Sequence, residues 1–122
     1  MLFTFSTMAV PNISVYDIQS ATDQTFRMVR FSIPGGVTSP DEFVSALSTV
    51  EGKIPGNVPV LINGRGPIWG YGMLIHAAHP TPAVATYDPR MLGYVIVETH
   101  DESFKLGDMV PAIEDQDKAS PN

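Results

Sequence analysis

Three histidines, an aspartate and two arginines carry most of the chemistry that this sequence could perform. All three histidines lie between residues 76 and 100. His76 and His79 are three residues apart in a segment expected to be helical, so their side chains share one face. Neutral imidazoles suit a transition metal such as manganese or zinc, and they also suit general acid–base catalysis. A metal centre and a metal-free proton-transfer site therefore both fit this pair.

Asp88 and Arg90 follow an apolar run and flank Pro89, which restricts the direction of the chain. In an extended segment, residues two apart point to the same side. The plainer interpretation is an Asp-Pro turn with a surface ion pair, which contributes little stability. In a catalytic site, Asp88 would orient a metal ion, a water or a histidine, and Arg90 would stabilise charge developing on a phosphate. His100 follows the next apolar run and is the third histidine of the group.

The loop Asn63-Gly64-Arg65-Gly66-Pro67 links an apolar strand to a segment expected to be helical. Its glycines let the backbone approach a ligand, and the unpaired N–H groups at the start of a helix attract anions. Arg65 would add a charge-assisted contact to a phosphate. A simple turn without a ligand is the alternative for a glycine-rich loop of this kind.

The elements that position these residues follow from the hydrophobic pattern and from the Pro and Gly signals. A first helix is expected from Ser39, a capping residue followed by Pro40 and Glu42, to about residue 50. A second helix is expected over 67–78. Strands are expected over 2–10, 25–33, 58–62, 82–87 and 93–97, with 106–113 as an edge strand that tolerates Pro111.

This order predicts an α+β fold, with a mixed sheet and helices on one face, similar to a ferredoxin-like fold. We expect one domain over residues 1–113, followed by an acidic, polar and mobile tail over 114–122. A chain of 122 residues with 43% hydrophobic residues suffices for one compact core. The absence of cysteine excludes disulfides, a cysteine nucleophile and thiolate-bound zinc, and it fits a reducing cytosol. We therefore expect a cytoplasmic protein that does not span a membrane.

The net charge of −6 argues against a long nucleic-acid surface. Residues 98–122 hold seven acidic residues and two lysines, which is −5 of that total. The rest of the chain is nearly neutral, so one or two arginines can still hold a small anion. DNA duplexes are disfavoured as partners, whereas short or compact phosphodiesters are not.

These residues resemble the third family of CRISPR ring nucleases, accessory proteins of type III CRISPR defence that degrade the second messenger cyclic tetra-adenylate. The resemblance covers roughly residues 58–110. The most specific motifs, in this order, are Gly64-Arg65-Gly66-Pro67-Ile68-Trp69, His76 with Ala78-His79-Pro80, Tyr87-Asp88-Pro89-Arg90, His100 and Leu106-Gly107-Asp108. The chain departs from the family pattern near Tyr94 and Glu98, where one extra residue separates the Asp-Pro-Arg segment from His100.

The resemblance implies a manganese-dependent phosphodiesterase that acts on cyclic tetra-adenylate or short RNA. It also implies a homodimer that associates to a tetramer or higher, and removal of adenylates from RNA 3′ ends is a described activity of the family. The implied catalytic residues are His79, Asp88 and Arg90. The expected metal ligands are His76, His79, Asp88 and His100, and the expected ligand-binding residues are Asn63, Gly64, Arg65, Gly66 and Trp69.

The length of the second expected helix bears on how such a site is assembled. From Pro67 to His79 the helix would be about 18 Å long at 1.5 Å per residue, so Arg65 and His79 would lie at opposite ends. We therefore expect catalysis to use residues from different subunits. A module that binds cyclic oligoadenylate or RNA ends without cutting them, and a scaffold with incidental histidines, are the alternatives from other functional classes.

Overall fold

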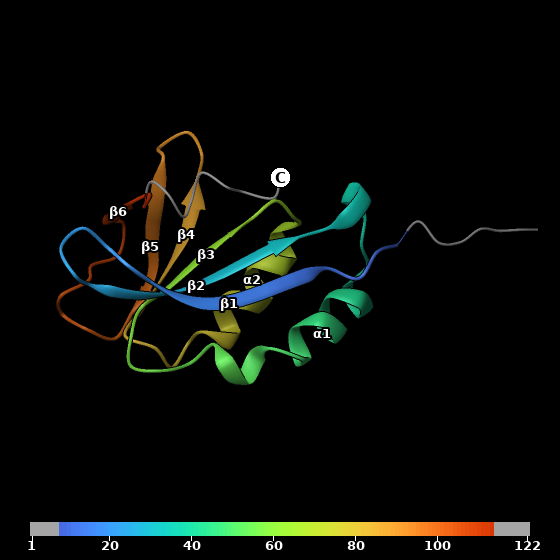
Figure 1. Ribbon diagram of the computed structural model, residues 1–122, viewed down its shortest axis with the longest axis horizontal. Helices are drawn as coiled ribbons and strands as arrows, with labels where there is room; N and C mark the ends of the chain where they lie inside the picture. Colours follow the sequence, from blue (N-terminus) through green and yellow to red (C-terminus); the bar gives the residue numbers. More distant parts are fainter. Residues whose placement is uncertain (1–7, 114–122) are drawn as a thin grey trace, which may run out of the picture.

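The computed structural model describes residues 8–113. Within this range, one sheet carries six strands that lie side by side in chain order, from β1 to β6 (Figure 1). Strands β2, β3 and β4 are parallel, and β1, β5 and β6 pair antiparallel to their neighbours. The strands are β1 Asn12–Gln19, β2 Thr25–Ser32, β3 Val60–Gly64, β4 Ala83–Asp88, β5 Gly93–Thr99 and β6 Met109–Pro111.

Two α-helices make the crossovers between the parallel strands, α1 (Pro40–Ser48) between β2 and β3, and α2 (Ile68–Ala77) between β3 and β4. Helix α1 begins as expected, because the Ser39 side chain accepts a hydrogen bond from the Glu42 N–H and Pro40 occupies the first turn. Short 3₁₀ turns, Pro34–Gly36 and Glu51–Lys53, flank α1.

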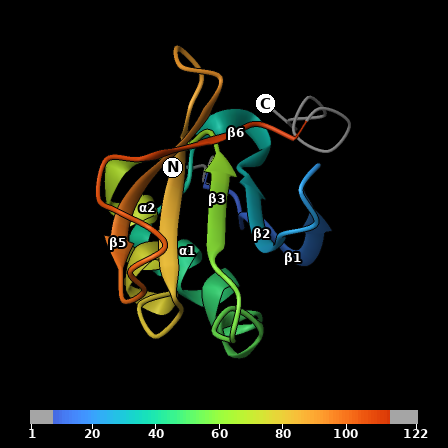
Figure 2. The ribbon, with the colours of Figure 1, turned by 90° about the vertical axis from the view of Figure 1, so that its left-hand side faces the viewer.

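Both helices cover the same face of the sheet, as Figure 2 also shows. Phe43 of α1 and Leu74 of α2 pack there against residues of β2, β3 and β4. A β-carbon at Gly70 would lie 2.9 Å from the Phe43 ring, so the glycine allows α2 to approach α1 closely. The opposite face has its own buried cluster, with Met28, Tyr94 and further residues of β1 to β5 under Phe104 and Val110.

The predicted α+β class, the mixed sheet and the placement of both helices on one face are confirmed. The strand order differs from the ferredoxin-like arrangement, in which a third strand lies between the two strands that a helix joins. Here β2 and β3 are direct neighbours, as are β3 and β4. The chain therefore forms two adjacent βαβ units between an N-terminal hairpin and a C-terminal meander.

The edge strand β1 was not predicted from the sequence. Residues 8–11 are irregular, while most of the predicted 2–10 strand and the 114–122 tail lie outside the described residues. The strand that pairs with β2 is β1, where the inward Ile13 and Val15 alternate with polar residues. A tight turn favours this pairing, because the Ser20 N–H donates to the Gln24 carbonyl between the two strands. The other expected helices and strands are confirmed to within a few residues.

No helix within residues 8–113 is both long enough and apolar enough to cross a membrane.

Candidate metal centre and anion loop

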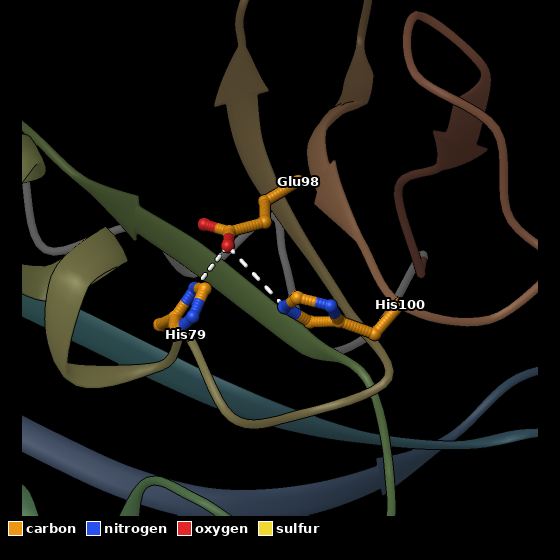
Figure 3. Close-up of side chains that lie close together, drawn as sticks. All are labelled: His79, Glu98 and His100. Atoms are coloured by element: carbon orange, nitrogen blue, oxygen red, sulfur yellow. Dashed lines mark hydrogen bonds and ion pairs between the residues drawn. The ribbon is translucent and has the colours of Figure 1, made fainter.

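A carboxylate and two imidazoles meet at the end of the sheet where β4 begins. His79 lies just past the end of α2, Glu98 lies on β5, and His100 follows β5. The Glu98 Oε2 contacts His79 Nδ1 and lies 3.4 Å from His100 Nε2 (Figure 3). The two imidazole rings pack edge to face, with centroids 4.8 Å apart and an interplanar angle of 81°.

A β-bulge in β5 turns Glu98 toward His79. The register with β4 shifts by one residue, so that Ala85 pairs with Ile96 but Val84 pairs with Glu98. Directly paired residues point to the same face of a sheet. Glu98 therefore lies on the face of Val84, which is the helix-covered face, whereas Ile96 lies on the opposite face. Without the extra residue, alternation would place Glu98 on the same face as Ile96.

The donor atoms of this cluster fit a divalent transition metal. One atom from each of His79, Glu98 and His100 lies within 4.8 Å of the others. Two imidazole nitrogens and one carboxylate oxygen form a ligand set that suits manganese, iron or zinc, and they leave positions for a substrate or water. About half of each imidazole side chain is exposed, 56% for His79 and 49% for His100, so a ligand can reach the cluster.

Asp88 and Arg90 form a separate pair at the opposite end of the β4–β5 hairpin. The Arg90 Nη2 donates to Asp88 Oδ2 over 3.1 Å, and the Arg90 backbone N–H donates to Asp88 Oδ1 over 2.9 Å. The Arg90 hydrogen bonds lower the pKa of the Asp88 carboxyl, and the pKa of Arg90 is raised in return. The Arg90 side chain is 87% exposed. Its guanidinium is held in place by Asp88 and still accessible to an anion.

The two groups are too far apart to act on one phosphate within a single chain. Glu98 pairs with Val84, which lies four residues before Asp88 on β4. At 3.3 Å per residue, this separates Asp88 and Glu98 by about 13 Å along the strands. The expected catalytic group of His79, Asp88 and Arg90 is therefore divided between the two ends of the hairpin, and Asp88 does not lie with the two histidines.

The predicted anion loop lies at the Asp88 end, because β3 and β4 run parallel and end there. Its first two residues are engaged within the protein. The Asn63 side chain is buried on the helix-free face and donates to the Tyr94 hydroxyl over 3.0 Å. The Tyr71 hydroxyl accepts from the Gly64 N–H and donates to the Gly64 carbonyl, which ties the loop to α2. Burial raises the pKa of Tyr71.

The remaining predicted ligand-binding residues are accessible. Arg65 and Gly66 are exposed and Trp69 is half-buried. His76, on the last turn of α2, is also exposed, and it is not one of the residues that converge on Glu98. Of the four expected metal ligands, the structure thus brings His79 and His100 together and adds Glu98.

Comparison with known proteins places this architecture in a family. Residues 37–111 match the model of the CRISPR-associated protein family Cas_csx3. The chain belongs to the Cas_csx3 family. The matched segment runs from the loop before α1 to the end of β6, so it includes the anion loop, the Asp88–Arg90 pair and the His79–Glu98–His100 cluster.

One relative of this Cas_csx3 protein is a protein of Aquifex aeolicus (strain VF5) described as uncharacterized. It is 46% identical over 54 residues, which are 44% of this chain and 49% of the relative. The chain thus spans about half the length of the curated relative that it matches.

Sequence reasoning missed Glu98 as a member of the cluster. A signal was present, because the one-residue departure from the family pattern was located near Tyr94 and Glu98. An extra residue inside a strand requires a bulge, and a bulge reverses the face of the residues that follow. In β5 the bulged residue is the exposed Val97, which has no partner on β4.

Proposed function

We propose that this protein is a metal-dependent phosphodiesterase that cleaves cyclic tetra-adenylate and so ends type III CRISPR signalling. The observation that carries the proposal is the convergence of His79, Glu98 and His100 at an accessible surface. Membership of a CRISPR-associated family supplies the biological setting. The exposed arginines at the opposite end of the sheet supply contacts for phosphate.

Cleavage of a phosphodiester requires an activated attacking oxygen, neutralised nonbridging oxygens and a protonated leaving oxygen. In RNA, the neighbouring 2′-hydroxyl is one available attacking group, and a water is the other. His79, Glu98 and His100 would hold Mn²⁺, which supplies charge stabilisation when bound. Glu98 Oε2 faces His79 Nδ1, so Nδ1 is the nitrogen that would share a metal with Glu98, and Nε2 remains available for proton transfer.

Arg90 binds a nonbridging oxygen of the substrate in this proposal. Asp88 is a positioning residue, because it accepts hydrogen bonds from Nε and Nη2 of Arg90, and these limit the orientations that the guanidinium can adopt. The bidentate geometry of a guanidinium suits phosphate. A neutral side chain at position 90 would remove this contact without disturbing buried packing.

The separation of about 13 Å along the strands between Asp88 and Glu98 leads us to propose that active sites form between subunits. A ring of four nucleotides is wide enough to bridge a cluster on one subunit and an arginine on another. Dimers would then associate to tetramers or larger assemblies through the ligand.

Mixing two inactive variants tests this arrangement. Arg90→Ala and His79→Ala proteins, combined under conditions where subunits exchange, are expected to regain activity because one kind of mixed site carries both intact residues. Two portions of the same variant are the control. If exchange is demonstrated and no activity returns, sites shared between subunits are excluded.

The reaction itself is tested by incubating the protein with cyclic tri-, tetra- and hexa-adenylate, with and without Mn²⁺, and resolving the products by chromatography. We expect linear products from cyclic tetra-adenylate, and only when Mn²⁺ is present. Binding of the ring without turnover would instead establish a binding module. If the cyclic adenylates stay uncleaved and adenosine monophosphate is released from RNA 3′ ends, the protein is a deadenylating exonuclease.

A further inference from the structure

Helix α2 presents an uncharged face to solvent, opposite the side on which Leu74 is buried. The helix contains no Asp, Glu, Lys or Arg. Ile68, Gly72 and His76 follow one another at intervals of four residues, so they share one face of α2, and all three are exposed. Ile68 is 87% exposed, the highest value of any large hydrophobic side chain within residues 8–113. Surface helices normally carry charged residues on the side that faces water, so this face has the composition of a contact surface.

Gly72, in the middle of this face, is not required by the packing of the chain itself. A glycine weakens a helix relative to alanine. Gly70 has a packing reason, because a β-carbon there would lie 2.9 Å from the Phe43 ring, whereas a β-carbon at Gly72 would meet no atom within 4 Å. The φ of Gly72 is not positive, so its backbone conformation does not require glycine either. A small residue lets a second helix approach closely, and Gly72 therefore suits a helix–helix contact with another molecule.

The position of Gly72 determines what an antiparallel pair of α2 helices would bring together. Arg65 and His79 each lie seven residues from Gly72, one before the helix and one after it, or about 10 Å along its axis. With a two-fold axis beside Gly72, Ile68 lies opposite the partner's His76, and Arg65 lies beside the partner's His79. Two ends that are remote within one chain are joined between two chains.

The charges at the two ends of α2 favour the antiparallel arrangement. Arg65 precedes the helix, and no carboxylate within residues 8–113 forms an ion pair with it. At the other end, Glu98 contacts His79, and Asp101 borders the same cleft as Pro80. An antiparallel pair opposes unlike charges at both ends and aligns the helix dipoles favourably, whereas a parallel pair would oppose like charges.

We propose that the exposed face of α2 packs antiparallel against the same face of a second copy, about a two-fold axis beside Gly72. Each subunit then contributes Arg65 to the candidate metal centre of the other. The inference rests on the proposed function for the chemistry of the joined site, and it identifies the surface through which two subunits share that site. One helix pair is a small interface, so the association without a ligand is weak and needs covalent trapping to be detected.

Because the chain has no cysteine, single cysteines introduced on α2 report on this contact alone. An Ile68→Cys protein is mixed with a His76→Cys protein that carries a tag of different mass, and the mixture is mildly oxidised and separated on a non-reducing gel. We expect the mixed disulfide dimer and no dimer of either protein with itself. Two copies of residue 68 would lie about 12 Å apart along the axis, whereas a disulfide needs Cα atoms within about 7 Å.

Two further variants give an independent test and a control. Gly72→Cys lies on the proposed axis and should cross-link with itself. Val44→Cys, at an exposed position of α1 outside this face, should stay monomeric. Adding Gly72→Gln to the Ile68→Cys and His76→Cys proteins should abolish their mixed dimer, because the longer side chain separates the helices. The unfolding midpoint should not fall, since position 72 faces open space within the subunit.

Three results would overturn the inference. Dimers of Ile68→Cys with itself, in place of the mixed dimer, would refute the antiparallel register. Cross-linking no faster than that of Val44→Cys, or a mixed dimer that persists with Gly72→Gln, would refute the contact. Cleavage of cyclic tetra-adenylate by a protein whose α2 cysteines do not cross-link would refute the contact alone. Cross-linking on α2 without manganese-dependent cleavage would refute the proposed function alone.

Discussion

Replacing Glu98 by glutamine should weaken Mn²⁺ binding far more than any other loss of one negative charge nearby. The substitution keeps the size of the side chain and removes the carboxylate that lies between His79 and His100. The imidazole side chains are about half exposed, 56% and 49%, so the dielectric constant of water gives a lower bound on the lost binding free energy. For a divalent ion and a unit charge about 4 Å apart, this lower bound is about 2 kcal/mol, or about thirtyfold in affinity.

Calorimetry, or electron paramagnetic resonance of unbound Mn²⁺, measures this affinity directly on the full chain. The matched control is Glu102→Gln, an exposed residue four positions further along that changes the net charge equally. It should bind Mn²⁺ like the wild type. Equal affinity of the Glu98→Gln variant and the wild type would refute the assignment of Glu98 as a ligand. An equal loss of Mn²⁺ affinity in the Glu98→Gln and Glu102→Gln variants would show that the overall negative charge of the surface, and not a specific ligand, attracts the ion.

Three further predictions follow from particular contacts. His79→Ala should abolish high-affinity Mn²⁺ binding while His76→Ala retains it, since only His79 lies with Glu98 and His100; equal losses in the two titrations would contradict the cluster. Tyr71→Phe removes both hydrogen bonds to the Gly64 backbone and should cost about 1–3 kcal/mol in urea unfolding; an unchanged midpoint would show that the clamp is dispensable. The Arg27 hydrogen bond lowers the pKa of Asp17, so this pair stabilises the fold above the ordinary carboxyl pKa of about 4, and the stabilisation is lost as the pH falls through the lower folded value. Asp17→Asn should therefore reduce the loss of folding stability as the pH falls below about 4. If stability falls with pH as steeply in this variant as in the wild type, the Asp17–Arg27 pair does not cause the pH dependence.

The sequence by itself predicted the elements whose signals are local. Ser39 and Pro40 specify where α1 begins, and the apolar runs specify β2, β3, β4 and β5. The edge position of β6 followed from Pro111, which lacks the N–H that an interior strand needs. Even the separation of Arg65 from His79 followed from helix length, because rise per residue is a local property.

Pairing and register required the tertiary structure. The 12–19 segment becomes a strand because it can close a hairpin on β2, and the sequence also offered the earlier 2–10 segment as a candidate. Strand order likewise depends on which long-range pairs form, so the adjacent βαβ units could not be distinguished from a ferredoxin-like arrangement.

The composition of the candidate metal centre also divides into what the sequence and what the tertiary structure determine. All three histidines were recognised from residue type and spacing, but their actual grouping depends on the face and the end of the sheet at which each side chain lies. One bulged residue on β5 moves Glu98 to the helix-covered face beside His79, and the length of the β4–β5 hairpin keeps Asp88 away. Spacing in the sequence determined which residues could do chemistry, and the register between two strands decided which of them meet.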